Sequence, residues 1–382
     1  MESFDIYYPC KGQEFKDTMR QLVESEIFAM LAQRLFPEST LEECRGLFLG
    51  FENVSQFQRV AMMRGCEWVV GNTMSAFTYS GAEHLGGGPC LFVSNHRDIV
   101  LDAMMLQYIL IGEGRDTSHV VVGTNLFEMP LMALLAKANK MYGISRGGTP
   151  REYYDSLMRM SAYLRHLVTE RGESAWIAQR NGRTKDGSDR TDPALIKMLA
   201  ASGDRRHPAE ALAAMRIVPV SVSYEWEPCG LLKARELCLR RQGPYAKQPG
   251  EDTESIVTGI CGFKGRVHFA ICPPLGDDEL RETRGSFDAV ASLIDSRIAA
   301  GARRYPSNAV AAQLREGRQP EGPEAQAFLE YLDDACRQHP GIDGYRDTLI
   351  AMYAPGERQM SNTIEATNRE PSLTATALNY KL

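Results

Sequence analysis

Length, composition and charge limit the classes of protein to which this chain can belong. It has 382 residues, of which 43% are hydrophobic and 24% are charged, as in an ordinary globular protein with a substantial core. The net charge of −6 provides no overall basic field for nucleic acid or anionic lipid. Any anion-binding site must therefore be built from local Arg and Lys side chains.

The sequence carries no signal for export or membrane insertion. Nine cysteines occur singly, with no C-x-x-C pair, which predicts reduced thiols in the cytoplasm and neither disulfides nor a zinc site. The segment from Met1 to Ile6 is acidic and lacks the basic and apolar parts of a signal peptide. No stretch approaches the roughly 18 consecutive apolar residues of a membrane span. We therefore expect a cytoplasmic protein that meets a membrane only peripherally.

Residues 1–77 are expected to form a helical N-terminal region. Apolar residues recur near helical spacing over residues 14–36 and stop at Pro37, which predicts one amphipathic helix. Residues 39–75 show further helical patterns. We expect the apolar face of the first helix to pack on the main domain. Contact of that face with a membrane is the alternative.

Residues 78–279 are expected to form the core of the protein, because short apolar strand patterns alternate with helical patterns there. The predicted fold class is α/β: a layered sheet flanked by helices, with helical N- and C-terminal extensions. Strand patterns occupy residues 90–94, 119–124, 140–144, 174–178 and 217–224, and helical patterns occupy residues 102–111, 130–139 and 153–171.

The last hundred residues read differently from the core. Helical, polar patterns at residues 287–303 and 323–337 predict a helical C-terminal region over residues 280–354. Residues 355–382 have weak periodicity and are expected to form a poorly ordered tail.

A histidine follows the predicted strand at residues 90–94 and has two acidic neighbours in sequence. The segment reads Ser94-Asn-His-Arg-Asp-Ile-Val-Leu-Asp102. A carboxylate on one ring nitrogen fixes the histidine tautomer and stabilises the imidazolium, so that the other nitrogen can act as a general base. Asp102 could fold back onto His96 from the start of the next helix, and Asp98 is its rival. A structural histidine at a strand end is the alternative interpretation.

Two later segments offer cations for an anionic ligand. Arg146 follows a short strand among small residues, where a guanidinium can reach an anion. Arg180, Arg183 and Lys185 lie in a polar loop that Gly182 makes pliable. Arginine forks suit phosphate oxygens. A solvated basic loop is the alternative for the second segment.

A formal G-x-S-x-G motif, Gly143-Ile-Ser-Arg-Gly147, raises a different possibility. Ser145 would then be a hydrolase nucleophile, with Asp252 and His268 in the matching chain order. A nucleophile elbow requires a helix directly after the turn, whereas two glycines and a proline delay the helix here. We keep the serine hydrolase as an alternative, with a structural role for His268 favoured.

Four short blocks occur in the order and rough spacing of one known family. The chain thereby resembles, over roughly residues 78–225, the glycerophospholipid acyltransferases, which act on glycerol 3-phosphate or lysophosphatidate. The blocks are Asn95-His96 with the following Asp102, Tyr142-Gly-Ile-Ser-Arg146, Ile177-Ala-Gln-Arg-Asn-Gly-Arg183 and Ile217-Val-Pro-Val220. Two departures stand out: the acid lies one residue later than in the family's H-x4-D block, and Asn181 stands where the family usually has Glu.

The resemblance implies direct acyl transfer. His96, oriented by Asp102, would deprotonate an acceptor hydroxyl as it attacks a thioester carbonyl of acyl-CoA or acyl carrier protein. No metal or other cofactor would be needed. The acyl chain is expected beside the helix at residues 102–111, and the proline of the fourth block is expected to line the site. Residues implied in binding the acceptor are Arg146, Arg180, Asn181, Gly182 and Arg183.

The resemblance also implies partners. They are the thioester donor, a glycerol-phosphate or lysophospholipid acceptor and the cytoplasmic face of a membrane, with no role for nucleic acid. An acylated amino acid is an alternative acceptor, because the third block departs from the family's pattern.

Overall fold

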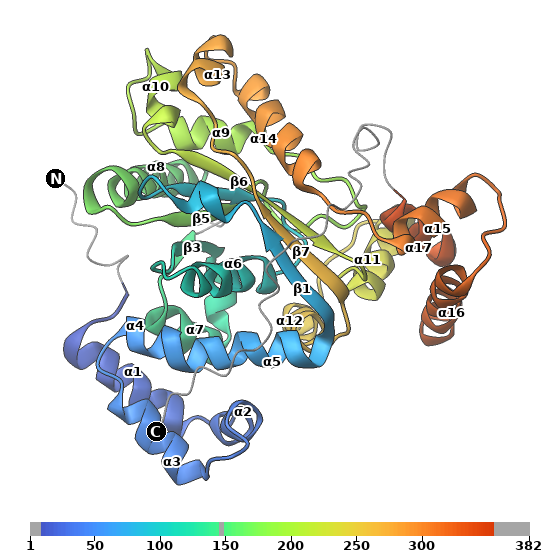
Figure 1. Cartoon of the computed structure of the whole chain (residues 1–382), viewed down its shortest axis with the longest axis horizontal. Coiled ribbons are helices and arrows are strands. Elements are labelled where there is room, and N and C mark those ends of the chain that lie inside the picture. The colour runs from blue at the N-terminus through green and yellow to red at the C-terminus, as the bar shows by residue number, and fades with distance from the viewer. Residues whose placement is uncertain (1–8, 145–148, 355–382) are drawn as a thin grey trace.

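One mixed sheet organises the molecule. The computed structural model describes residues 9–144 and 149–354, which hold a seven-stranded sheet in the order β1-β7-β6-β2-β5-β3-β4 (Figure 1). Strands β6 and β7 pair antiparallel and every other pair is parallel, so the five strands from β6 to β4 point the same way. The strands are β1 (Met74–Ser80), β2 (Leu91–Ser94), β3 (His119–Gly123), β4 (Met141–Ile144), β5 (Ala175–Ala178), β6 (Ile217–Tyr224) and β7 (Gly265–Ile271).

Helices cover both faces of the central strands, which explains the continuous apolar runs in their sequences. Alternate residues of β2 serve the two layers, with Phe92 in one apolar core and Leu91 and Val93 in the other. The α/β fold with a layered sheet flanked by helices is confirmed. The first layer holds α5 (Met63–Thr73) and α6 (Leu101–Gly112), and the second holds α8 (Pro150–His166), α9 (Pro193–Ala200) and α14 (Phe287–Gly301).

The N-terminal helices form a bundle with its own apolar core (at the bottom of Figure 1). The single helix predicted over residues 14–36 is wrong, because the chain turns extended at Ser25, whose hydroxyl donates to the carbonyl of Leu22 at 2.6 Å. The part of the predicted apolar face on α1 is buried within this bundle, whereas Met30 on α2 is 50% exposed. The helices are α1 (Gly12–Glu24), α2 (Phe28–Leu35), α3 (Leu41–Gly50) and α4 (Val54–Phe57), packed on α7 (Pro130–Ala138).

A third helical group lies beside the ends of β6 and β7 (at the right of Figure 1). It packs around Trp226, directly after β6, and consists of α11 (Gly230–Gln242), α15 (Pro306–Arg315), α16 (Pro323–Gln338) and α17 (Tyr345–Tyr353). Helix α14 packs on the sheet and not in this group, so the apolar core runs past residue 279. Residues 355–382, the predicted tail, lie outside the described residues.

The remaining elements, four short 3-10 or π-helical segments and three α-helices, connect those described above. Within residues 9–144 and 149–354, no helix is both long and apolar enough to cross a bilayer. The connections are η2 (Gln58–Met62), η3 (Ala82–Leu85), η4 (Thr124–Glu128), η5 (Leu167–Arg171), α10 (Pro208–Ala213), α12 (Glu251–Cys261) and α13 (Asp277–Glu282).

Candidate active site

The carboxyl ends of the five parallel strands meet at one edge of the sheet, where ligands bind in open α/β folds. His96 follows β2, which lies between β5 and β6 in the middle of that edge. The loop that begins at Arg180 follows β5. Topology therefore brings two segments together that are more than 80 residues apart in sequence, and a backbone hydrogen bond from Thr184 to the carbonyl of His96 (2.7 Å) joins them directly.

A buried carboxylate holds the ring of His96. The Nδ1 atom of His96 lies 3.0 Å from Oδ2 of Asp102, and the Asp102 side chain is fully buried in the first turn of α6. The backbone amides of Arg97 and Asp98 donate to the same oxygen at 2.6 and 2.8 Å. These bonds leave Nε2 of His96 as the ring nitrogen available to a ligand.

The second oxygen of Asp102 has a partner from a distant strand. The hydroxyl of Tyr224, at the end of β6, donates to Oδ1 of Asp102 at 3.0 Å. Burial and the neighbouring Asp102 charge raise the pKa of Tyr224 well above its ordinary value, so the phenol keeps its proton as a donor. Nothing in the local sequence around His96 predicts this contact.

Asp98, the rival carboxylate, faces another part of the protein. Its Oδ1 accepts the backbone amides of Val100 and Leu101 at 2.9 Å each, at the start of α6. Its Oδ2 lies against α12, where a Cβ atom on Gly259 would approach it to 2.3 Å. Burial and the charge of Asp102 raise the pKa of Asp98. The geometry thus pairs Asp102, and not Asp98, with His96.

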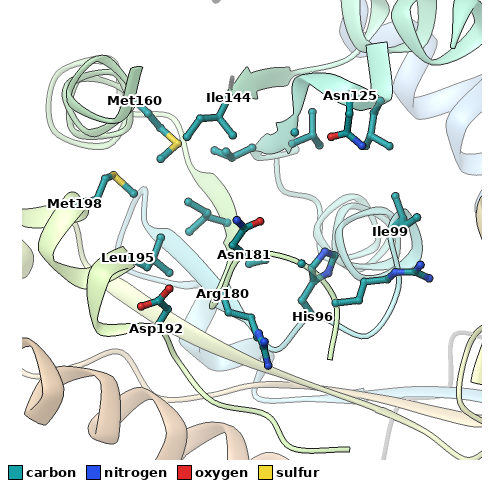
Figure 2. Close-up of a pocket in the computed structure, with 18 of the residues that line it drawn as sticks. His96, Ile99, Asn125, Ile144, Met160, Arg180, Asn181, Asp192, Leu195 and Met198 are labelled. Carbon is teal, nitrogen blue, oxygen red and sulfur yellow. The ribbon is translucent and has the colours of Figure 1, made fainter. Parts of the chain in front are cut away.

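A cavity of about 260 Å³ opens beside His96 and has two chemically different sides (Figure 2). One side is polar and carries His96, Arg180 and Asn181. The other side is apolar and comes from β3, β4, β5, α8 and α9. The apolar lining residues are Val121, Ile144, Leu157, Met160, Ile177, Leu195 and Met198.

The loop residues predicted to bind a ligand all line this cavity. They are Arg180, Asn181, Gly182 and Arg183. In the described parts of the chain, the Arg180 side chain makes no ion pair or hydrogen bond. Arg183 donates to the hydroxyl of Ser255 at 3.2 Å, while its buried Nη1 has no hydrogen-bond partner there. Arg146 and Ser145 lie outside the described residues.

The polar side also holds Lys247 and Asn125, which were not predicted, besides Lys185 of the basic loop and Asp252 of the hydrolase alternative. Lys247 and Asp252 line the cavity and pair with each other, and Asn125 from η4 donates to Asp252 at 3.3 Å. Lys185 lines it too but is paired with Glu236 of α11. These residues come from loops that meet only in the folded protein.

Two expectations about the fourth block and the acyl groove need correction. Pro219 pairs with Val93 inside the sheet and does not line the cavity, because the strands that line it are β3, β4 and β5. None of residues 102–111 lines it either, because α6 buries its apolar residues in the core between the sheet and α5.

His268 lies in the interior of the sheet, away from the cavity. Its Nδ1 lies 2.9 Å from the hydroxyl of Thr78 and its Nε2 lies 3.1 Å from that of Ser80, both on the neighbouring strand β1. Burial lowers the pKa of His268 to about 3. Both nitrogens are therefore engaged in a neutral, structural setting. In the described part of the chain, no cluster of three or more His, Cys, Asp or Glu side chains is arranged to hold a metal ion.

Residues 76–223, from β1 to β6, match the model of the Acyltransferase family. These residues form an acyltransferase-family domain. The matched segment contains His96, Asp102 and the loop at residues 180–192, so the acyltransferase recognised from the four sequence blocks is confirmed. The enzyme is therefore an acyltransferase.

Comparison with solved structures and curated proteins adds the following. The chain is similar to the 1-acyl-sn-glycerophosphate (LPA) acyltransferase PlsC from Thermotoga maritima, with a TM-score of 0.37 and 12% sequence identity. The similarity covers 74% of this chain and 95% of that chain. No curated protein matches the sequence.

Proposed function

We propose that this acyltransferase moves a fatty acyl group from acyl-CoA or acyl carrier protein to a hydroxyl of a glycerol-phosphate or lysophospholipid acceptor, with His96 as general base. The observation that carries the proposal is the His96–Asp102 pair at 3.0 Å, at the edge of a cavity with one cationic and one apolar side. An acyl thioester needs the apolar side and an anionic acceptor needs the cationic side.

The proposed reaction is a single displacement through a tetrahedral intermediate. His96 Nε2 takes the hydroxyl proton as the acceptor oxygen bonds to the thioester carbonyl carbon. Asp102 stabilises the imidazolium through Nδ1. The carbon–sulfur bond then breaks, and the departing thiolate takes up the proton from His96. Donor and acceptor supply every atom and electron of this transfer, so the reaction itself calls for no cofactor.

Two arginines support an anionic acceptor. The Arg180 side chain has no polar partner among the described residues, and Arg183 keeps one buried nitrogen without a hydrogen bond. Guanidinium groups bind phosphate oxygens in pairs of hydrogen bonds. Asn181, a neutral side chain beside them, is also able to bind the uncharged polar part of an acceptor.

The apolar side is the proposed place of the acyl chain. It is lined by Leu157 and Met160 of α8 and by Leu195 and Met198 of α9. Removing a methylene group from water in such a place stabilises the bound chain by about 0.8 kcal/mol. We accordingly place the acyl group between α8 and α9, with the thioester carbonyl near His96.

A lipid acceptor also supports the proposal of peripheral contact with the cytoplasmic face of a membrane. Tyr153 lies on the rim of the cavity with 39% of its surface exposed, and Tyr154 beside it is 52% exposed. Tyrosines with one polar end and one apolar end suit a membrane interface. Phospholipid biosynthesis is the pathway class that this reaction would serve.

Transfer assays with the purified protein test the acceptor. Labelled acyl-CoA and labelled acyl carrier protein are each offered with glycerol 3-phosphate, lysophosphatidate and an acylated amino acid. Formation of a phosphate-bearing acyl product, weakened by Arg180→Ala, is the expected result. A preference for the acylated amino acid would replace the proposed acceptor. Thioester hydrolysis without transfer, abolished by Ser145→Ala, would establish the serine hydrolase alternative instead.

A further inference from the structure

Behind His96 lies a buried ionic network that does not line the cavity beside it, although Lys233 lines a smaller one of about 20 Å³. Its members are Arg97 in the loop after β2, Glu227 after β6 and Lys233 in α11. The Lys233 residue is only 1% exposed, and its ammonium group donates to Oε1 of Glu227 at 2.6 Å. The same ammonium group also donates to the backbone carbonyl of Arg97. Burying a lysine is costly unless such partners compensate for the lost hydration.

These contacts hold Arg97, the residue after His96, at both its backbone amide and its backbone carbonyl. The amide of Arg97 donates to Asp102, and the carbonyl of Arg97 accepts from Lys233. One residue earlier, the carbonyl of His96 accepts from Thr184. The loop that carries the ring is therefore held by groups from α6, from α11 and from the loop after β5.

The Arg97 side chain closes the network. Its Nε lies 3.3 Å from Oε2 of Glu227 and its Nη1 lies 3.5 Å from Asp189. Asp189 in turn accepts from the side chain of Asn95 at 2.8 Å. Each charge in the network thus has an opposite charge beside it. Lys233, Glu227 and Asp189 connect the His96 loop to α11, to the segment after β6 and to the loop after β5.

The C-terminal helices reach the same network. The backbone amide of Glu227 donates to the hydroxyl of Tyr353, at the end of α17, at 2.9 Å. The Tyr353 ring packs edge-on against Phe328 of α16 (centroids 5.1 Å apart) and is itself buried. The helical group of α11, α15, α16 and α17 is therefore connected to the His96 loop through Glu227.

We propose that Lys233 is a positioning residue for acyl transfer. Through its hydrogen bonds to Glu227 and to the carbonyl of Arg97, Lys233 holds the His96 loop in a fixed position beside the cavity. The C-terminal helices support this arrangement through the contact of Tyr353 with Glu227. This inference rests on the proposed role of His96 as base. It assigns to Lys233 an effect on turnover and none on substrate binding, because Lys233 does not line the cavity.

The chain offers a matched control for Lys233. Lys264 is also 1% exposed, and its ammonium group is held by the hydroxyl of Thr73 (2.9 Å) and by the carbonyls of Ile260 and Gly262. None of these partners belongs to the His96 loop. Lys233→Met and Lys264→Met therefore remove the same buried group, but only the first removes a hydrogen bond to the loop, whereas Lys264 acts on Asp98 of the loop through its charge alone.

The test compares kcat, KM and melting temperature for both variants, with kcat calculated per folded molecule. We expect Lys233→Met to lower kcat on the order of 10- to 100-fold, as for a displaced base, with KM within about twofold. Lys264→Met should lower the melting temperature and keep kcat within about twofold. Equal kcat losses in both variants, or none in Lys233→Met, would overturn the proposal.

Two further measurements keep the inference separate from the proposed function. In the double variant His96→Ala/Lys233→Met, the residual rate should equal that of His96→Ala, because Lys233 acts through His96. If His96→Ala itself retains full activity, the general-base proposal fails first.

If Lys233→Met does not fold, Glu227→Gln serves in its place, with the same kcat loss expected. Nuclear magnetic resonance signals of the His96 ring in labelled protein should shift in these variants and not in Lys264→Met, and unshifted signals would contradict the positioning role.

Discussion

The Asp102 carboxylate accepts from four groups at once, namely His96 Nδ1, the amides of Arg97 and Asp98, and the Tyr224 hydroxyl. Four donors leave the carboxylate one orientation, and that orientation fixes the ring of His96. The tautomer of His96 with a proton on Nδ1 follows from the same contact. The proposed catalytic role of Asp102 is thus one of orientation and charge.

We expect Asp102→Asn to lower kcat by about 10³- to 10⁴-fold, because an amide nitrogen toward His96 favours the wrong tautomer. Asp98→Asn is the matched control, since an Asn oxygen still accepts the amides of Val100 and Leu101. Its kcat should stay within about tenfold of the wild type. A larger loss in Asp98→Asn than in Asp102→Asn, in the same transfer assay, would reverse the assignment of the two carboxylates.

The pairing of His96 with a nearby acid could be predicted from sequence because both residues lie in one short loop. The partners of that pair could not, because they depend on topology: Tyr224 lies 122 residues from Asp102, and Lys233 lies 136 residues from Arg97. The choice between Asp98 and Asp102 also required the structure, because both are close to His96 in sequence. In the structure, the Asp98 carboxylate accepts the amides at the start of α6, whereas the Asp102 carboxylate contacts His96.

At the scale of single elements, α8 and α9 determine the apolar side of the cavity. Met160 and Met198 are 2% and 6% exposed and contribute side chains to it from the two helices. The sequence predicted a helix at residues 153–171, which is α8, but it predicted no element at the position of α9. Its eight residues follow a long polar loop and are too few for a clear periodic pattern.

We expect Met198→Trp to shift the acyl-donor preference toward shorter chains, because the indole fills part of the apolar side. The ratio of kcat/KM for a long over a short acyl-CoA should fall by about tenfold, equivalent to roughly two buried methylene groups. Met160→Leu conserves volume and should leave this ratio unchanged. An unchanged ratio in Met198→Trp would place the acyl chain elsewhere.

Helix α12 packs closely on the Asp98 side of the His96 loop. A Cβ atom at Gly259 would lie 2.3 Å from the buried Asp98 carboxylate, whereas Gly46 in α3 has no atom within 4 Å of such a position. We expect Gly259→Ala to lower the free energy of unfolding by about 1–3 kcal/mol. Gly46→Ala should raise it by up to about 1 kcal/mol through helix propensity. Urea unfolding measures both, and a stabilised Gly259→Ala would contradict the close contact.

At the scale of the whole molecule, one sheet is surrounded by the helices on its two faces, by the N-terminal bundle and by the C-terminal group. The sequence predicted that these helical groups exist, but not how they pack. The five strands β2 to β6 were predictable because buried parallel strands are short continuous apolar runs. Their order was not, because it depends on which edges pair; the antiparallel contact of β6 with β7 is an example. Helices α15, α16 and α17 pack on α11 and Trp226, and no periodic pattern in the sequence predicts these contacts.

Stability should depend on pH through His268, which β1 and β7 bury together. Its pKa is about 3 in the folded protein against an ordinary value of 6.5, so below pH 6.5 the unfolded chain binds a proton that the folded chain excludes. The free energy of unfolding should therefore fall as the pH drops from 6.5 toward 3, with a slope from this group of up to about 1.4 kcal/mol per pH unit.

The measurement is urea unfolding at pH 7, 6, 5 and 4. His268→Gln should reduce the slope over this range, and His84→Gln, whose ring is 28% exposed, should not. Equal slopes for His268→Gln and the wild type would contradict a neutral buried His268.

The central claim is that His96 is the base for acyl transfer, and its turnover measurement is the most direct test. Purified wild type, His96→Ala and the control His84→Ala are compared with saturating acyl thioester and acceptor. We expect His96→Ala to lose at least about 10²-fold in kcat, with the melting temperature close to that of the wild type and His84→Ala fully active. Undiminished transfer by His96→Ala would contradict the account.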